Sequence, residues 1–257
     1  MTIETIGRCL RLAVMTPNDT HYKICTAALD AGFHVICDKP LTTNLATAVD
    51  LAREVKKTGA EFCLTYCYTG YPMVRQARAM VHSGAIGAIR QVHLQFVQGY
   101  LAFDEVPPSW RLDPARVGAS LILIDIGTHA CHLGAYVTGL DLASVCADVG
   151  HVVPGHSVDD YASLLLRYSN DARGSMWVTN AAAGAEHGLS FRIFGETGGL
   201  EWNQEEPNRL THRKRALRAN QVVIKLGLVH NVDCEICSTS TRRQCGLPCF
   251  PGGACGG

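Results

Sequence analysis

The chain has 257 residues, of which 47% are hydrophobic and 18% charged, so it holds enough apolar material for one large or two smaller cores. Its 23 basic and 23 acidic side chains cancel, which excludes the strong positive field typical of proteins that bind nucleic acid or anionic membranes. No apolar run approaches the roughly 18–20 residues of a spanning helix, and the sequence opens without an export signal. We expect a soluble, cytoplasmic protein without nucleic-acid or membrane partners.

Charge and cysteine are unevenly distributed along the chain. Residues 1–206 carry 15 basic and 21 acidic side chains, whereas residues 207–257 carry 8 and 2. Five of the 12 cysteines crowd into the second segment. We expect residues 207–257 to be a basic, Cys-rich tail without a fixed fold. The alternative is a zinc site, since four thiolates could come from Cys234, Cys237, Cys245, Cys249 and Cys255.

Up to residue 65 the sequence alternates between strand and helix patterns. Short apolar runs are typical of buried parallel strands. Between them lie stretches of helical periodicity that end at Gly32 and Gly59, where a left-handed residue suits a helix end. This alternation predicts a parallel sheet with right-handed crossovers. The expected strands span 9–15, 34–37 and 61–65, and the second expected helix spans 44–58.

The apolar periodicity of these helices also predicts which side of each faces the sheet. In both helices we expect one apolar stripe to be buried. The expected inward residues are Ile24, Ala27, Ala28 and Ala31 in the first helix, and Leu45, Val49, Ala52 and Val55 in the second.

From Tyr71 onward the pattern changes to long alternating stretches, typical of half-buried antiparallel strands. Chain reversals at 169–170 and 196–199 favour hairpins. Helices are expected over 72–83 and 125–138. An α+β domain with one open, mostly antiparallel sheet should therefore follow the α/β layer. Its expected strands cover 89–100, 144–153, 161–168, 172–182, 189–195 and 199–202.

The run Asp38-Lys39-Pro40 directly follows the expected strand at 34–37. Ligands of open parallel sheets bind outside the carboxyl ends of the strands, and Lys39 lies at such an end. Pro40 keeps Lys39 out of the helical region and allows a cis bond, so we expect the lysine to point in a fixed direction. The alternative is a solvated lysine in a turn.

Asp125, His129, His132 and Tyr136 fall at i, i+4, i+7 and i+11 of the helix expected over 125–138, which places them on one face. A carboxylate one turn from an imidazole can orient the ring and favour its protonated form, as a proton shuttle near neutral pH requires. Two alternatives stay open. Asp125 and the two histidines could bind a metal ion, or the cluster could be a structural hydrogen-bonded network.

Trp110 and Arg111 lie in a segment with little regular pattern. An aromatic ring beside a guanidinium suits a stacked or anionic ligand, and it equally suits a surface anchor.

Several ordered motifs recur at separations that a known family shares. They are Thr16-Pro17-Asn18-Asp19-Thr20-His21, the segments 27–32 and 34–41, Tyr68 to Arg75, Trp110-Arg111-Leu112-Asp113, Asp125-Ile126-Gly127-Thr128-His129 and 195–202. Together they resemble the Gfo/Idh/MocA oxidoreductases, the relatives of glucose–fructose oxidoreductase and inositol dehydrogenase. The resemblance implies a dehydrogenase that moves hydride between NAD or NADP and a sugar, inositol or related polyol.

The resemblance also implies residue roles. Lys39 matches the lysine of the family's Glu/Asp-Lys-Pro motif, which touches the substrate hydroxyl and the nicotinamide end of the cofactor. Asp125 and His129 match the family's acid and proton-relaying histidine, so all three are expected to be catalytic. Hydride removal from a carbinol needs a base on its hydroxyl, a role for His129 oriented by Asp125, while Lys39 stabilises the developing oxygen charge. No metal site is implied. Residues expected beside the cofactor are Thr16, Pro17, Asn18, His21, Asp38, Lys39, Pro40, Tyr66, Trp110 and Arg111.

The sequence departs from the family near its beginning. The family opens on a strand, a Gly-x-Gly-x-x-Gly loop and a helix that bind the pyrophosphate, whereas Gly7 is the only glycine before Gly32 here. We therefore expect an α/β plus α+β fold in three parts. These are a partial Rossmann-like NAD(P)-binding sheet in 1–66 that lacks the Gly-rich unit, a substrate and oligomerisation domain in 67–206, and the tail.

The leading hypothesis is an NAD(P)-dependent oxidoreductase that acts on a small sugar or polyol and forms a homo-oligomer. One alternative is a non-catalytic remnant that serves only in self-association. The other is a metal-dependent lyase or hydrolase that uses Asp125, His129 and His132.

Overall fold

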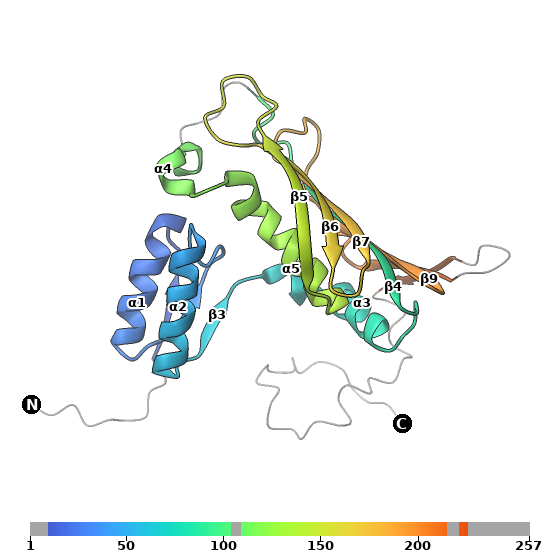
Figure 1. The fold of residues 1–257 in the computed structure, drawn as a ribbon, viewed down its shortest axis with the longest axis horizontal. Coiled ribbons are helices and arrows are strands. Elements are labelled where there is room, and N and C mark those ends of the chain that lie inside the picture. Colours follow the sequence, from blue (N-terminus) through green and yellow to red (C-terminus); the bar gives the residue numbers. More distant parts are fainter. Residues whose placement is uncertain (1–9, 104–108, 215–220, 226–257) are drawn as a thin grey trace, which may run out of the picture.

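The computed structural model describes residues 10–103, 109–214 and 221–225. Its strands form a parallel sheet of three strands, sheet A, and a second sheet of eight strands, sheet B. Figure 1 shows sheet A and its helices at one end of the molecule and sheet B at the other. The expected fold class, a Rossmann-like parallel layer followed by a mostly antiparallel sheet, is confirmed for the described part of the chain.

Sheet A has the strand order β1-β2-β3, and its buried face lies against two helices. The second helix starts at Asn44, whose side chain accepts a hydrogen bond from the amide of Thr47 at 3.0 Å. It ends at Gly59, which has the left-handed φ of 67° that the sequence predicts. The elements are β1 (Arg11–Val14), α1 (His21–Asp30), β2 (His34–Cys37), α2 (Leu45–Thr58) and β3 (Phe62–Leu64).

The inward faces expected for the two helices are largely wrong. In α1 the buried stripe passes through Cys25 and Leu29, and in α2 Leu51 is buried while Leu45 is 79% exposed. Each helix has two adjacent apolar stripes, and packing against sheet A decides between them, which periodicity alone does not. Of the expected inward residues, Ile24, Ala28 and Val55 do pack against the core. Those found exposed are Ala27, Ala31, Leu45, Val49 and Ala52.

Sheet B has the order β11-β10-β9-β8-β4-β7-β6-β5, and every neighbouring pair is antiparallel except β4 and β7. The strands expected between residues 89 and 203 are all present, with ends that differ by a few residues. The strands are β4 (Ile89–Val97), β5 (Leu142–Gly150), β6 (Tyr161–Tyr168), β7 (Arg173–Thr179), β8 (Gly188–Gly195), β9 (Gly198–Asn203), β10 (Arg209–Lys214) and β11 (Gln221–Lys225).

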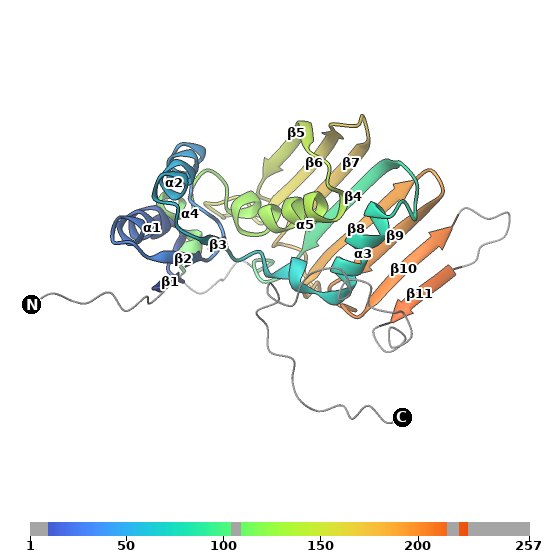
Figure 2. The same cartoon turned by 90° about the horizontal axis from the view of Figure 1, so that it is seen from below.

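Helices α3 and α5 cover one face of sheet B, and Figure 2 shows both on the same side of the strands. Phe96, Leu133, Phe191 and Trp202 are all buried in the core between these layers. None of the described helices is long and apolar enough to cross a membrane. The helical elements not yet given are η1 (Asn18–Thr20), η2 (Cys67–Gly70), α3 (Pro72–His82), η3 (Trp110–Leu112), α4 (Pro114–Val117), η4 (Leu123–Gly127) and α5 (Thr128–Thr138).

The helix that carries Asp125 and His129 begins with the π-helical turn η4. The carboxylate of Asp159 fixes this start, because it accepts hydrogen bonds from the backbone amides of Leu121 at 2.7 Å and Ile122 at 3.2 Å. A π turn spaces hydrogen bonds at i→i+5 and so rotates residues away from their α-helical positions. Asp125 and His129 nevertheless both line one pocket.

The sheet continues into the segment that we expected to be a tail. Leu210 and His212 of β10 are buried, and β10 pairs with both β9 and β11. The expected boundary at residue 206 thus falls inside sheet B, between β9 and β10, because β10 is a mostly polar strand in which only Leu210 is apolar. Residues 226–257, including the cysteines of the zinc alternative, lie outside the described residues.

Candidate active site

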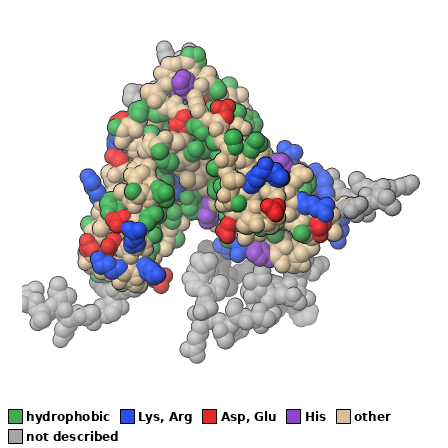
Figure 3. Space-filling view, viewed as in Figure 1, with side chains coloured by type: hydrophobic (Ala, Val, Ile, Leu, Met, Phe, Trp, Pro, Cys, Tyr) green, Lys and Arg blue, Asp and Glu red, His purple; other side chains and the backbone are tan. Residues whose placement is uncertain are grey.

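Two pockets adjoin each other, and the first lies where sheet A faces the second domain. The first, of about 320 Å³, takes Asp38 and Lys39 from the sheet A side and Phe96 and His129 from the sheet B side. The second has a volume of about 380 Å³. They share a wall formed by Gln98, Asp125 and His187. Figure 3 shows the molecule hollowed between these two parts, with hydrophobic side chains along both walls.

The structure brings Lys39 and Asp125 together in the first pocket. The Lys39 ammonium donates to the Asp125 carbonyl oxygen at 2.6 Å and to Oδ1 at 2.7 Å. The side chains are 21% and 13% exposed, so the ion pair is partly shielded from water. Lys39 follows β2 and Asp125 lies in η4, so this contact joins the two domains.

His129 lies in the same pocket but makes no bond to Asp125. Its ring is buried, and Nδ1 has no hydrogen-bond partner among the described residues. The rings of Tyr66, Tyr68 and Phe96 meet it edge-on at centroid distances of 5.5, 4.7 and 6.2 Å. Burial, with a further contribution from the Lys39 charge, lowers the pKa of His129 to about 3.

The expectation that Asp125 orients His129 therefore differs from the observed geometry. The carboxylate is bonded to Lys39, although Asp125 and His129 line the same pocket. His129 is held instead by aromatic packing, and its neutral ring is able to accept a proton.

His132 and Tyr136 continue along α5 away from the pocket. His132 stacks on Tyr66 with centroids 4.1 Å apart, and Tyr136 carries the Arg78 guanidinium 4.5 Å above its ring. Within residues 10–103, 109–214 and 221–225, no group of three His, Cys, Asp or Glu side chains is arranged to hold a metal ion. Asp125, His129 and His132 thus give no support to the metal alternative.

The loops after β1 and β2 lie together beneath the pocket. Asn18 and His21 are buried, and His21 contacts the carbonyl oxygens of Thr16 and Pro40, each at 2.8 Å. Asp38 accepts a hydrogen bond from the hydroxyl of Thr65 at 2.7 Å, which ties the end of β2 to the end of β3. Residues expected beside the cofactor are therefore gathered at the carboxyl ends of sheet A, although His21 is engaged within the protein.

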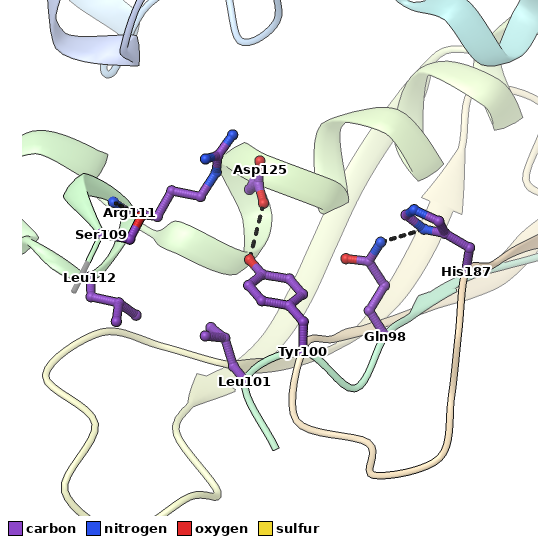
Figure 4. A pocket seen from close by; sticks show the side chains of 8 residues that line it. All are labelled: Gln98, Tyr100, Leu101, Ser109, Arg111, Leu112, Asp125 and His187. Carbon is purple, nitrogen blue, oxygen red and sulfur yellow. Dashed lines mark hydrogen bonds between the residues drawn. The ribbon is translucent and has the colours of Figure 1, made fainter. Parts of the chain in front are cut away.

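Arg111 lines the second pocket, and Trp110 lies near Arg116, which pairs with Asp19 in the loop after β1. The Arg111 guanidinium stacks 4.5 Å above the Trp110 ring and lines the pocket. Figure 4 shows Arg111 and Tyr100 on either side of Asp125. The stacked arrangement is the one that suits a planar or anionic group.

Tyr100 and Asn180 are site residues that the sequence did not reveal. The Tyr100 hydroxyl donates to Oδ2 of Asp125 at 3.4 Å and accepts from Nδ2 of Asn180 at 2.9 Å. Burial, and then the Asp125 charge, raise the pKa of Tyr100, so its hydroxyl stays protonated. Gln98, which bonds His187 at 2.5 Å, was also missed. The one sequence signal that could have pointed to Gln98 and Tyr100 is that polar residues directly follow the alternating pattern of β4.

Comparison with known protein families agrees with this arrangement. Residues 8–66 match the oxidoreductase family with an NAD-binding Rossmann fold, and residues 74–201 match the Gfo/Idh/MocA C-terminal domain. The chain belongs to the Gfo/Idh/MocA oxidoreductase family. The resemblance inferred from the motifs is thereby confirmed.

Individual relatives in this family are oxidoreductases. An uncharacterised oxidoreductase of Bacillus subtilis, YfiI, is 37% identical over 211 residues, which cover 78% of this chain and 53% of the relative. The crystal structure of an inositol dehydrogenase homologue with NAD+ from Azotobacter vinelandii aligns with a TM-score of 0.80 at 33% identity, over 86% of this chain and 58% of that one. The levoglucosan dehydrogenase of Pseudarthrobacter phenanthrenivorans is 29% identical over 77% of this chain and 56% of its own length. The Gfo/Idh/MocA chain described here thus spans little more than half the length of these relatives.

Proposed function

We propose that this chain is the substrate-binding and nicotinamide-facing part of a dehydrogenase that moves hydride between NAD(P) and a hydroxyl-bearing carbon of a sugar, inositol or related polyol. The observation that carries the proposal is the meeting of Lys39, Asp125 and His129 from two domains in one pocket of about 320 Å³. A pocket of this size suits a small ligand. The inositol and levoglucosan dehydrogenases among the relatives point to the same substrate class.

Each of the three side chains has a distinct role in this proposal. Oxidation of a carbinol releases hydride from carbon and a proton from the hydroxyl. His129 takes that proton, because its ring is neutral and its proton affinity rises as negative charge develops on the substrate oxygen. Lys39 donates a hydrogen bond to the same oxygen, and Asp125 holds Lys39 in place.

NAD(P), when bound, supplies or accepts the hydride. The carboxyl ends of the sheet A strands fit the nicotinamide end of such a group, because their loops open on the pocket beside Lys39. In the proposal the contacts come from residues 16–18 after β1, 38–40 after β2 and Tyr66 after β3, with Trp110 and Arg111 reaching across from the second domain. A glycine-rich pyrophosphate cradle does not occur among the described residues, so the proposal is limited to the nicotinamide end.

The proposal is tested by NADH fluorescence titration and by turnover of inositol, levoglucosan and xylose with NAD+ and NADP+. We expect saturable NADH binding, and a loss of kcat of about 100-fold or more in Lys39→Met and His129→Asn, since general acid–base groups contribute about 10²–10⁴. The exposed His82 on α3 offers a matched control, His82→Asn, which should keep full activity. Absence of NADH binding at millimolar concentration, or full rates in His129→Asn, would contradict the proposal.

We also propose that two copies associate through the face of sheet B opposite α3 and α5. Leu165, Trp177 and Phe194 are 67%, 41% and 37% exposed on this face, which no described helix covers. Large exposed apolar side chains on one face favour association. Light scattering should report a dimer or larger assembly that Leu165→Asp dissociates. A wild-type chain that stays monomeric at tens of micromolar concentration would contradict the proposed association.

A further inference from the structure

His21 makes two contacts that a neutral ring cannot make as hydrogen bonds. It is the first residue of α1, and its side chain is fully buried. Nδ1 lies 2.8 Å from the carbonyl oxygen of Pro40, and Nε2 lies 2.8 Å from that of Thr16. A carbonyl oxygen only accepts, and a neutral imidazole carries a single N–H. Both contacts are hydrogen bonds only when the ring carries two protons.

We infer that His21 is a buried imidazolium that clamps the loop after β1 to the loop after β2 and so acts as a positioning residue for Lys39. A neutral ring would set a nitrogen lone pair against a buried carbonyl oxygen, an arrangement that is both repulsive and unsolvated. Charge-assisted bonds from a doubly protonated ring are stronger than neutral ones, which matches the two short distances.

The clamp acts on Lys39 through its neighbour. Pro40 follows Lys39 in the chain, and its carbonyl belongs to the peptide between Pro40 and Leu41, so the clamp fixes the chain one residue after Lys39 and limits where the lysine side chain can point. The other end of the clamp is also anchored, because the Thr20 hydroxyl donates to the Pro17 carbonyl at 2.7 Å and meets the Thr16 hydroxyl at 2.6 Å. His21 thus ties the carboxyl ends of β1 and β2 together below the pocket. The catalytic consequence of holding Lys39 in place rests on the proposed function. The charge state of the His21 ring does not.

The acids nearest in the fold are already engaged with other groups. Asp19 pairs with Arg116 at 3.2 Å, and Asp38 accepts from Thr65. The direct partners of the His21 charge are therefore the two carbonyl groups. The charged or titratable side chains on the elements around it are Arg11 on β1, Asp19 on η1, Tyr22, Lys23, Cys25 and Asp30 on α1, His34 and Cys37 on β2, Asp38 and Lys39 after β2, Asp50, Arg53, Glu54, Lys56 and Lys57 on α2, and Arg116 on α4.

The charge state is measured by long-range proton–nitrogen NMR of the full chain labelled with ¹⁵N-histidine at about pH 7.5, where an ordinary imidazole is mostly neutral. We expect both His21 nitrogens to give protonated-type signals. The His21 signal is identified by its loss in His21→Gln. Should that variant not fold, contacts of the ring protons with Pro40 identify the signal in the wild type. A neutral pattern at His21 overturns the inference.

The positioning role is measured separately, on the Lys39 side-chain signal and on turnover. In His21→Gln, which keeps only one donor, we expect the Lys39 ammonium signal to shift and kcat to fall about 10-fold with little change in the KM for the sugar. His82→Gln should change neither. A His21→Gln chain with a lower Tm but an unmoved Lys39 signal overturns the positioning role.

These measurements separate the two proposals. If no substrate turns over in any variant while both His21 nitrogens are protonated and the Lys39 signal moves, the proposed function fails and the clamp stands. If turnover is normal while His21 is neutral, the clamp fails and the proposed function stands.

Discussion

The ammonium of Lys39 donates to both the carbonyl oxygen and Oδ1 of Asp125, although 86 positions separate the two residues. Lys39 leaves the end of β2, and Asp125 lies in the π turn ahead of α5. The ion pair therefore bridges sheet A and the helix that packs on sheet B. Because it is mostly shielded from water, each partner depends on the other for its hydrogen bonds.

Removing either partner of this pair should destabilise the fold. In Asp125→Asn the shielded ammonium loses its carboxylate, which we expect to lower the free energy of unfolding by about 2 kcal/mol, and Lys39→Met should act similarly. In urea denaturation the double variant should lose less stability than the sum of the two single losses. The difference, which is the coupling energy of the pair, should be about 1–3 kcal/mol.

A solvent-exposed ion pair provides the control for that cycle. Arg90 and Glu196 are 3.0 Å apart with side chains 64% and 48% exposed, so their coupling should stay below about 1 kcal/mol. Additive costs at Lys39 and Asp125 would mean that the contact contributes nothing to stability.

The buried ring of His129 should make the protein sensitive to acid. Its folded-state pKa is lowered to about 3, whereas the unfolded chain titrates near 6.5. The unfolded chain therefore binds the extra proton first as pH falls, so this stability is present above about pH 6.5 and is lost on going down toward pH 3. The loss is on the order of 4 kcal/mol. His129→Leu should show a flatter stability profile between pH 7 and pH 4 by urea denaturation, and an unchanged slope would contradict the burial effect.

Much of the fold could be predicted because its signals are local. Strand β6 occupies the residues at which the alternation predicts it, and α2 ends at Gly59, which the sequence predicts as a left-handed cap. The buried face of each helix could not be predicted, because two apolar stripes compete and only packing against sheet A selects one. Strand β10 could not be predicted either, because Leu210 is its only apolar residue.

The candidate site could be predicted only in part, for a similar reason. Lys39, Asp125 and His129 stand in motifs, but the contact between Lys39 and Asp125 joins residues 86 positions apart, and local patterns do not specify such a contact. Tyr100 and Asn180 meet because β4 and β7 pair in parallel, which aligns their carboxyl ends. Their pairing joins strands that are far apart in the chain, and periodicity does not specify such partners.

Tyr100→Phe should weaken both the site and the fold by modest amounts. The variant removes one hydrogen bond to Asp125 and leaves Nδ2 of the fully buried Asn180 without its partner. We expect a loss of about 1 kcal/mol in stability and a fall in kcat/KM of about 10-fold in the dehydrogenase assay. Tyr136→Phe is a matched control, because Arg78 contacts the face of that ring, which the substitution keeps. Equal effects of the two variants would show that Tyr100 has no special role.

Gly118→Ala should separate the two domains. Gly118 has a φ of +92°, and a Cβ there would lie 2.5 Å from the carbonyl oxygen of Thr43 in the sheet A domain. The Cβ is rigidly attached to the backbone and the oxygen is itself backbone, so no side-chain rotation relieves the contact and the two segments must move apart, for which we expect destabilisation of about 3 kcal/mol. Gly84→Ala isolates the backbone cost, because Gly84 has a φ of +78° and nothing within 4 Å of its added Cβ. Gly84→Ala should lower the free energy of unfolding by only about 1 kcal/mol.

Because Thr43 follows the loop that holds Lys39, Gly118→Ala should also reduce the coupling between Lys39 and Asp125. Undiminished coupling in that background would mean that the ion pair does not depend on how closely the domains approach at Gly118.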